Sequence, residues 1–142
     1  MRRYLINYPQ KFVVLIILVS FFLSNTACSL FGTNGDEKPP SAPTGLKGIS
    51  KDGEISLVWD PSSASDLEGY NIYRSQNSFS NKKNANRIGG LIQSNIVNFD
   101  DKQVKNGTTY FYRVTAVDEN DNESQLSIEI SKTPFPSPPD DP

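Results

Sequence analysis

The sequence contains no histidine and only one cysteine, Cys28. Without histidine the chain lacks the usual base for a serine or cysteine nucleophile and the commonest neutral metal ligand. It also has no glycine-rich phosphate loop and no serine in a nucleophile-elbow pattern. A single cysteine cannot form a disulfide within the chain. We therefore expect no catalytic residues, no cofactor, no metal site and no enzymatic activity.

Clusters of basic residues are also lacking. Only three of the 14 Lys and Arg residues precede Cys28, whereas all 16 Asp and Glu residues follow it. The chain from Cys28 onward thus carries a net charge of −5. Nucleic-acid binding depends on neutralising phosphates with clustered Lys and Arg. The sequence therefore excludes nucleic acid as a partner.

The longest apolar run, residues 12–23, is too short for an ordinary membrane span. It follows Arg2, Arg3 and Lys11 and contains no charge. A transmembrane helix needs about 20 apolar residues, whereas a signal peptide combines a positive start with roughly 7–15 apolar residues. We interpret residues 1–27 as a signal peptide, which predicts export.

The letters "SNTAC" after this run resemble the lipobox of bacterial lipoproteins. Thr26 and Ala27 are the small residues expected before the cysteine, while Asn25 stands where the motif usually has an aliphatic residue. The resemblance implies that Cys28 receives a lipid and anchors the protein to a membrane. Ser29 resembles the sorting state of outer-membrane lipoproteins, which implies the outer membrane or cell surface of a bacterial envelope. Ordinary cleavage near Ala27 and an uncleaved anchor are the alternatives.

Composition divides the rest of the chain into three parts. Residues 28–41 follow no period and are rich in turn formers and charge, which predicts a flexible tether. Residues 42–134 alternate apolar and polar positions and form the expected domain. Residues 135–142 form a proline-rich tail of extended conformation. We interpret the tail as a passive end; the alternative is a groove ligand presented through Pro136 and Pro139.

The expected domain is all-β, because its apolar residues recur at every second position and no helical stripe persists. Leu126, Ile128 and Ile130 are expected to share the inward face of the last strand. Seven short strands in about ninety residues are typical of a sandwich of two antiparallel sheets. They are expected near residues 46–49, 54–60, 69–74, 87–92, 97–101, 108–118 and 124–132.

Two stretches of the domain closely resemble fibronectin type III domains. In "ISLVWDPSSASDLEGYNIYRS", Trp59 stands at the position of the family's core tryptophan and Tyr70 ends its "D-L-x-G-Y" turn. In "FDDKQVKNGTTYFYRVTAVDENDNES", Tyr110 occupies the place of the tyrosine corner. The resemblance implies a seven-stranded, immunoglobulin-like β-sandwich, with structural roles for Trp59, Tyr70 and Tyr110.

Side chains on the outward face are candidates for binding. If Tyr110 and Tyr112 point inward, then Phe111 and Arg113 point outward, next to Tyr73 of the neighbouring strand. Tyr73, Phe111 and Arg113 would form an aromatic and basic patch suited to a protein or polysaccharide ligand. The alternative is that these side chains only pair across strands.

One loop has the spacing of a calcium site. In "DENDNES", Asp118, Asn120 and Asn122 alternate as calcium ligands do, but Glu123 occupies the position where a calcium loop needs glycine. We interpret this stretch as a hairpin loop without a metal.

These features together predict a non-catalytic protein anchored by lipid in a bacterial envelope. Its domain is expected to serve as a protein- or polysaccharide-binding module. One alternative is a structural spacer or assembly subunit of an envelope complex. Another is an accessory to a neighbouring carbohydrate-active enzyme, which rests on the company that similar domains keep.

Overall fold

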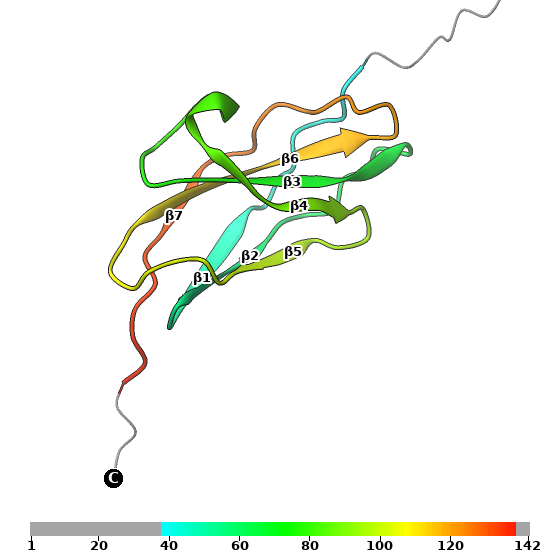
Figure 1. Ribbon diagram of the computed structural model, residues 1–142. Coiled ribbons are helices and arrows are strands. Elements are labelled where there is room, and N and C mark those ends of the chain that lie inside the picture. The colour runs from blue at the N-terminus through cyan, green and yellow to red at the C-terminus, as the bar shows by residue number, and fades with distance from the viewer. Residues whose placement is uncertain (1–37, 139–142) are drawn as a thin grey trace, which may run out of the picture. The chain divides into compact units, whose positions relative to one another are not determined.

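The computed structural model describes residues 38–138, which form two antiparallel sheets packed face to face (Figure 1). Sheet A has the strand order β1-β2-β5, and sheet B has the order β4-β3-β6-β7. The expected all-β sandwich of seven strands is confirmed. Cys28 and the signal segment lie outside the described residues. The strands are β1 Lys47–Lys51, β2 Glu54–Val58, β3 Leu67–Ser75, β4 Asn86–Gln93, β5 Asn98–Asp101, β6 Tyr110–Asp118 and β7 Ile130–Lys132.

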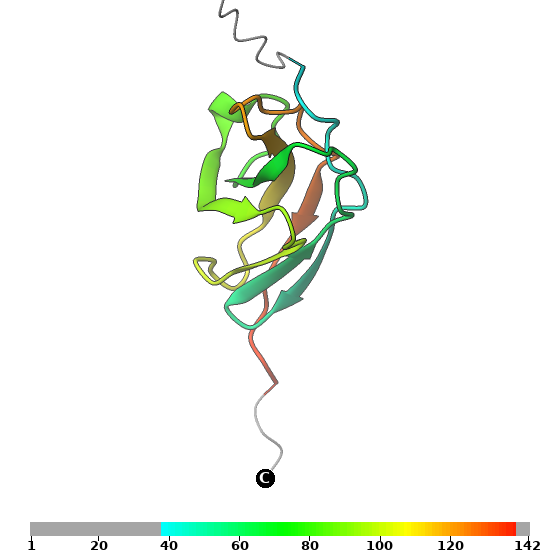
Figure 2. The ribbon, with the colours of Figure 1, turned by 90° about the vertical axis from the view of Figure 1, so that its right-hand side faces the viewer.

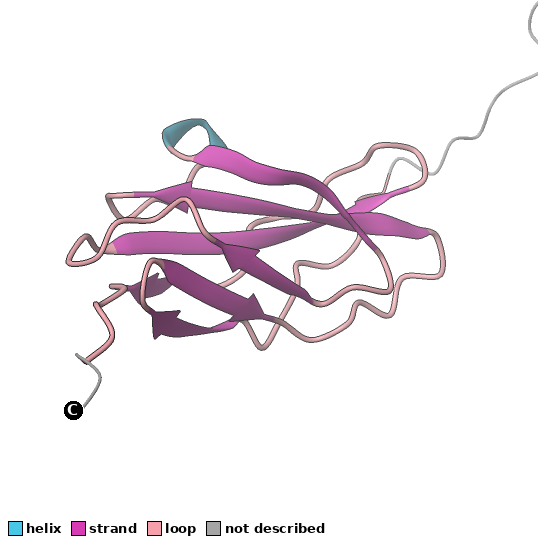
Figure 3. Ribbon diagram, turned by 60° about the horizontal axis from the view of Figure 1, so that its bottom comes forward, coloured by secondary structure: helices cyan, strands magenta, loops and turns pink. Residues whose placement is uncertain are grey.

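A single short 3-10 turn, Lys82–Asn84, interrupts the β structure of residues 38–138 (Figure 3). It lies in the connection between β3 and β4 and begins where the side chain of Asn81 accepts a hydrogen bond from the Lys83 N–H. Over the same residues, no helix has the length and hydropathy needed to cross a bilayer.

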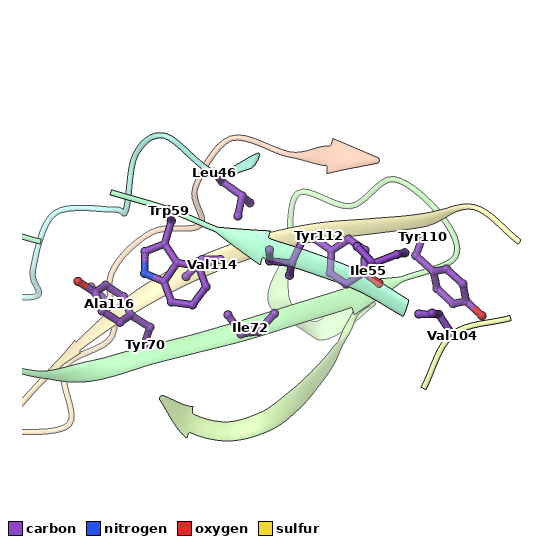
Figure 4. Packing of buried hydrophobic residues seen from close by; sticks show 11 residues of the cluster. Leu46, Ile55, Trp59, Tyr70, Ile72, Val104, Tyr110, Tyr112, Val114 and Ala116 are labelled. Atoms are coloured by element: carbon purple, nitrogen blue, oxygen red, sulfur yellow. The ribbon is translucent and has the colours of Figure 1, made fainter. Parts of the chain in front are cut away.

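The core lies between the two sheets and is built from alternate residues of the central strands. Ile55 and Leu57 of β2 and Tyr112 and Val114 of β6 belong to one cluster, and all four are buried. Figure 4 shows Ile55, Tyr112 and Val114 in this cluster. Burying one large apolar side chain stabilises a fold by roughly 1.5–3 kcal/mol. The buried cluster comprises Leu46, Ile55, Leu57, Trp59, Tyr70, Ile72, Val104, Tyr110, Tyr112, Val114 and Ala116.

The three aromatic residues that the family resemblance singles out lie inside this core. The rings of Trp59 and Tyr70 meet edge to face, with centroids 5.3 Å apart and planes at 67°. Aromatic pairs prefer this arrangement. At the other end of the cluster, the hydroxyl of Tyr110 accepts a hydrogen bond from the Lys105 N–H at 3.1 Å (Figure 4). This bond to upstream backbone is the geometry of a tyrosine corner.

A buried ion pair joins the two sheets. The Arg74 guanidinium of β3 donates to both carboxylate oxygens of Asp101 in β5, at 2.9 and 2.8 Å, and Asp101 is only 3% exposed. The Tyr112 hydroxyl donates to the same carboxylate at 2.9 Å. Burial and the adjacent Asp101 charge raise the pKa of Tyr112, so its hydroxyl stays a donor. The sheets are therefore fixed by a polar cluster as well as by apolar packing.

The last strand differs from the sequence expectation. Regular pairing with β6 is confined to Ile130–Lys132, and Ile128 is 68% exposed instead of facing inward. Ser124 and Ser127 are buried in its place. The inward positions therefore recur every third residue before Ile130, as in an extended polyproline-like chain, and not every second residue as in a strand.

Serine hydroxyls cause this difference. Each serine donates its backbone N–H to β6, from Ser124 to the Ala116 carbonyl and from Ser127 to the Val114 carbonyl, both at 2.9 Å. The hydroxyls accept in return from the N–H groups of Ala116 and Val114, at 2.9 and 3.0 Å. Side-chain oxygens thus replace the carbonyls of a regular ladder, and a period-two apolar pattern does not reveal this.

The described chain enters and leaves the sandwich at opposite ends (Figures 1 and 2). Beyond β7, the Gly107 N–H donates to the Pro134 carbonyl at 2.8 Å and the Ser137 N–H donates to the Asp52 carboxylate at 3.1 Å. Pro134 is buried, whereas Phe135 is half exposed. Residues 133–137 therefore contact the turn between β1 and β2.

Candidate functional site

The residues predicted to form a binding patch come from two paired strands of sheet B. Tyr73 of β3 lies opposite Arg113 of β6, and Phe111 lies opposite Ser75. All three occupy the face turned away from sheet A, which we call the outer face. The structure thus brings the predicted residues together on the expected side.

That outer face is covered. Tyr73 is only 8% exposed, its neighbour Asn71 is 4% exposed, and Thr115 is fully buried. The connection between β3 and β4 lies on this side of the sheet (Figure 2). The expectation that Tyr73 is accessible is wrong, because residues 76–85 and 119–129 fold over it.

Glu123 is the centre of the covering network. Its Oε1 atom accepts hydrogen bonds from Asn71 Nδ2 at 2.9 Å, the Tyr73 hydroxyl at 2.8 Å and the Thr115 hydroxyl at 2.5 Å. Its Oε2 atom accepts from Lys82 Nζ at 2.8 Å. One carboxylate therefore ties two strands of sheet B to the 3-10 turn.

Electrostatics show how strongly this carboxylate is held as an anion. Burial alone would raise the pKa of Glu123, but hydrogen bonds from Lys82, Thr115, Asn71 and Tyr73 outweigh it and lower the pKa to about 2. Burial and the bond to Glu123 raise the pKa of Tyr73 to about 12. The Tyr73 hydroxyl therefore remains a donor at neutral pH.

A second carboxylate, Glu129, fastens the start of the same connection. It accepts from the Ser78 hydroxyl at 2.6 Å and from the Phe79 N–H at 2.9 Å, and it lies 3.4 Å from Arg113 Nε. The Arg113 guanidinium stacks over the Phe79 ring at 5.7 Å and donates to the Ser127 carbonyl at 2.6 Å. Arg113 is thus occupied in packing the covering segment.

The predicted patch did not include the residues that cover it, among them Phe79, Lys82 and Glu123. In the sequence, Glu123 stands out only as the residue that replaces glycine in a calcium-like loop. Phe79 lies in a polar stretch without periodicity, so no local pattern marks it as buried. Their roles depend on contacts between residues more than forty positions apart.

The stretch with calcium-like spacing forms a hairpin loop. The buried Asp118 carboxylate accepts from the backbone N–H groups of Asn120 and Asn122, at 2.9 and 2.8 Å, and from the Asn122 side chain at 3.0 Å. Asp121 adopts a positive φ of 63°, as turn residues of this type can. The Asp118 carboxylate therefore organises the turn by accepting hydrogen bonds from Asn120 and Asn122.

One of the concave surfaces of residues 38–138 lies between β4 and β5, each of which is one of the two edge strands of its sheet. It is a cleft of about 370 Å³. Its lining combines apolar and charged residues: Arg87, Ile88, Gly89, Phe99, Asp100, Asp101, Lys102 and Gln103. Unlike the outer face of sheet B, the cleft is not closed by another segment of the described chain.

Comparison with known proteins identifies the family. The family model described as "Fibronectin type III domain SaeA third domain" matches residues 43–133. The chain belongs to the fibronectin type III family. The solved structure of an Fn3-like protein from Clostridium thermocellum is 29% identical, with a TM-score of 0.56 over 71% of this chain and 98% of that one. A β-1,2-glucanase from Parabacteroides distasonis is 26% identical, with a TM-score of 0.58 over 71% of this chain and 14% of the other.

Curated relatives are large enzymes of which the chain matches a small part. The amylopullulanase of Thermoanaerobacter thermohydrosulfuricus is 40% identical over 103 residues, which are 68% of this chain and 6% of the enzyme. The poly(3-hydroxybutyrate) depolymerase of Ralstonia pickettii is 30% identical over 129 residues, or 90% of this chain and 22% of the enzyme. Because fibronectin type III domains are typically non-catalytic, the matching region is an accessory part of these enzymes.

Proposed function

We propose that this protein is an exported lipoprotein, anchored through Cys28 in a bacterial envelope, whose fibronectin type III domain is a non-catalytic module for binding a polysaccharide or a protein. The signal-like segment and the "NTAC" motif support export and lipidation. The outer membrane or cell surface is the proposed location, on the basis of Ser29.

One observation carries the binding role. The same domain, at 36–40% identity, forms part of amylopullulanases, which are named for polymeric carbohydrates. A domain carried by several enzymes of this kind is suited to hold a polymer near a catalytic domain. In the present chain, the lipid would place it at a surface, where it could serve a neighbouring carbohydrate-active enzyme.

Two experiments test this proposal. Metabolic palmitate labelling of the full chain and of Cys28→Ala checks the anchor, and we expect label only in the former. Equal labelling of both, or none in either, would contradict lipidation.

The second experiment tests binding. Detergent-solubilised protein is mixed with insoluble starch, cellulose or poly(3-hydroxybutyrate) granules, which are then sedimented, and with envelope proteins, which are then captured. Retention by at least one of these is expected; retention by none would refute a binding role.

A structural spacer is the second candidate, because the described chain enters and leaves the sandwich at opposite ends (Figure 1). A domain with this arrangement separates whatever precedes it from whatever follows. The spacer role predicts a co-purifying membrane complex and no captured polymer. A monomer recovered after detergent extraction, with polymer retained, would favour the binding module.

A further inference from the structure

The loop before β6 contains an asparagine followed by glycine, Asn106–Gly107. Asparagine is chemically labile in proteins, and a following glycine offers no side chain that would hinder attack on its amide. Both residues are exposed, so water reaches the pair. Such a pair deamidates spontaneously wherever its surroundings leave the two residues free.

Deamidation begins with the backbone nitrogen of Gly107. Its lone pair forms a bond to Asn106 Cγ, the bond from Cγ to Nδ2 breaks, and Nδ2 leaves as ammonia with the proton lost from Gly107. Water then opens the cyclic imide at either carbonyl, which gives aspartate or isoaspartate. The reaction therefore requires a Gly107 N–H that can lose its proton and an Asn106 side chain that can turn toward it.

In the folded domain the Gly107 nitrogen is engaged. The Thr108 N–H donates to the Lys105 carbonyl at 3.2 Å, and Gly107 has a φ of 78°, which is a tight turn with glycine at the position that needs positive φ. The Gly107 N–H donates to the Pro134 carbonyl at 2.8 Å. Because the Pro134 side chain is fully buried, this acceptor is held in place.

The Asn106 side chain is engaged as well. Its Oδ1 atom accepts from the Gly53 N–H at 2.9 Å, and its Nδ2 atom donates to Asp52 at 2.7 Å. The hydrogen bonds from Asn106 and from the Ser137 N–H lower the pKa of Asp52, so its carboxylate remains an acceptor at neutral pH. The amide of Asn106 must break two bonds before it can turn toward the Gly107 nitrogen.

One segment, residues 133–137, holds both reacting groups. It accepts from Gly107 through the Pro134 carbonyl, and the Ser137 N–H donates at 3.1 Å to the same Asp52 carboxylate that binds Asn106. Figure 1 shows that this segment leaves the sandwich at the end where the β1–β2 turn lies. Release of the segment would therefore free the nucleophile and loosen the amide together.

We propose that Asn106 is a deamidation site that residues 133–137 keep closed, so that release of this segment converts Asn106 to aspartate or isoaspartate. An aspartate at this position cannot donate to Asp52 and places a second negative charge beside it. Isoaspartate also adds a methylene to the backbone next to Gly107. The segment is thus bound less tightly after the reaction. The site does not depend on the proposed binding function.

The rate of deamidation tests the proposal. The full chain in detergent is incubated at neutral pH and digested with pepsin in acid, which avoids deamidation during digestion. The mass of the peptide containing Asn106 is followed, and isoaspartate methyltransferase gives a second readout. The full chain should react at least about tenfold more slowly than a synthetic peptide of residues 103–110, because opening must first break several hydrogen bonds. Equal rates would overturn the proposal.

Two truncations test the role of the segment. A chain that ends after Thr133 lacks the Pro134 carbonyl and should deamidate about tenfold faster than the full chain. A chain that ends after Phe135 keeps this carbonyl and loses the Ser137 bond, so its rate should rise less than about threefold. Equal rates in the two truncations, both shown by urea unfolding to be folded, would refute protection by the segment.

A substitution decides the matter if the shorter truncation does not fold. Asp52→Ala, at an exposed turn position, removes the bonds to Asn106 and Ser137 and should speed deamidation about fivefold. Glu119→Ala removes an exposed carboxylate at the opposite end of β6 and should leave the rate unchanged. Equal rates in these two variants would overturn the proposal.

Discussion

The central strands of sheet B, β3 and β6, bury most residues on both of their faces, but by different means. On β3, Tyr70 and Ile72 point toward sheet A and are fully buried, while Asn71 and Tyr73 point to the outer face and are 4% and 8% exposed. The inner face is buried because apolar side chains from the two sheets pack together. The outer face is buried because Glu123 holds the connection between β3 and β4 against it through a bond with Lys82. Burial alone therefore does not reveal which interactions hold a face closed.

The largest effect is expected on the inner face. Ile72→Ala removes a fully buried side chain from the centre of the core and should lower the free energy of unfolding by about 3 kcal/mol, from lost transfer energy and the cavity left behind. Urea unfolding measures the loss. Ile49→Ala, at a position 64% exposed, is the control and should change stability by less than about 0.5 kcal/mol. Similar losses for both variants would contradict the assigned core.

The outer face should respond to a single carboxylate. Glu123→Gln keeps the shape but removes the charge that accepts from Asn71, Tyr73 and Thr115. We expect a loss of about 2 kcal/mol at pH 7, typical of hydrogen bonds to a charged group. Urea unfolding at neutral pH measures it. A loss below about 0.5 kcal/mol would show that the network only fills space.

Comparison of the wild type with Glu123→Gln also isolates the contribution of Glu123 to the pH dependence of stability. The folded protein lowers the pKa of Glu123 from 4.5 to about 2, so the unfolded state binds the proton more readily in this range. The stabilisation is fully present above pH 4.5 and is lost as the pH falls toward about 2. The stability difference between the wild type and Glu123→Gln should therefore shrink on acidification below pH 4.5. A constant difference down to pH 3 would contradict the lowered pKa.

The inner face was predictable from sequence, and the outer face was not. Alternation of Ile55, Leu57 and Trp59, together with the tyrosine-corner pattern at Tyr110, is local and reports directly on burial between the sheets. The cover on the outer face comes from polar residues, and hydrophobic periodicity carries no information about which carboxylate meets which strand. Alternation therefore places Tyr73 on the outer face but does not show that other residues cover it.

The last segment of sheet B shows the same limit. Ser124 and Ser127 are buried by bonds of their hydroxyls to β6, and a scale that ranks serine as polar assigns them to the surface. The cleft between β4 and β5 escaped prediction because it combines Gly89, which has a positive φ, with residues from two sheets. Neither feature follows from the pattern of one strand.

Removing one of the serine hydroxyls that bond to β6 should lower the free energy of unfolding by an intermediate amount. Ser127→Ala takes away the oxygen that accepts from the Val114 N–H and leaves that buried donor unpaired, which costs about 1.5 kcal/mol. Chemical denaturation gives the size of the loss. Ser131→Ala, at an exposed position of the regular strand β7, should be nearly neutral. Equal effects of the two substitutions would mean that the hydroxyl of Ser127 does not act as a ladder acceptor.

The smallest effect should come from the lysine that closes the outer face. Lys82 is partly exposed and its ion pair with Glu123 spans 2.8 Å, so Lys82→Met should cost only about 0.5 kcal/mol of global stability. Hydrogen exchange should nevertheless quicken at the amides of residues 76–85, because the pair ties this connection to the sheet. Lys83→Met changes the exposed neighbour and should leave that exchange unaltered. If both variants exchange alike, the connection is held by Phe79 and Glu129, and the ion pair is only a surface contact.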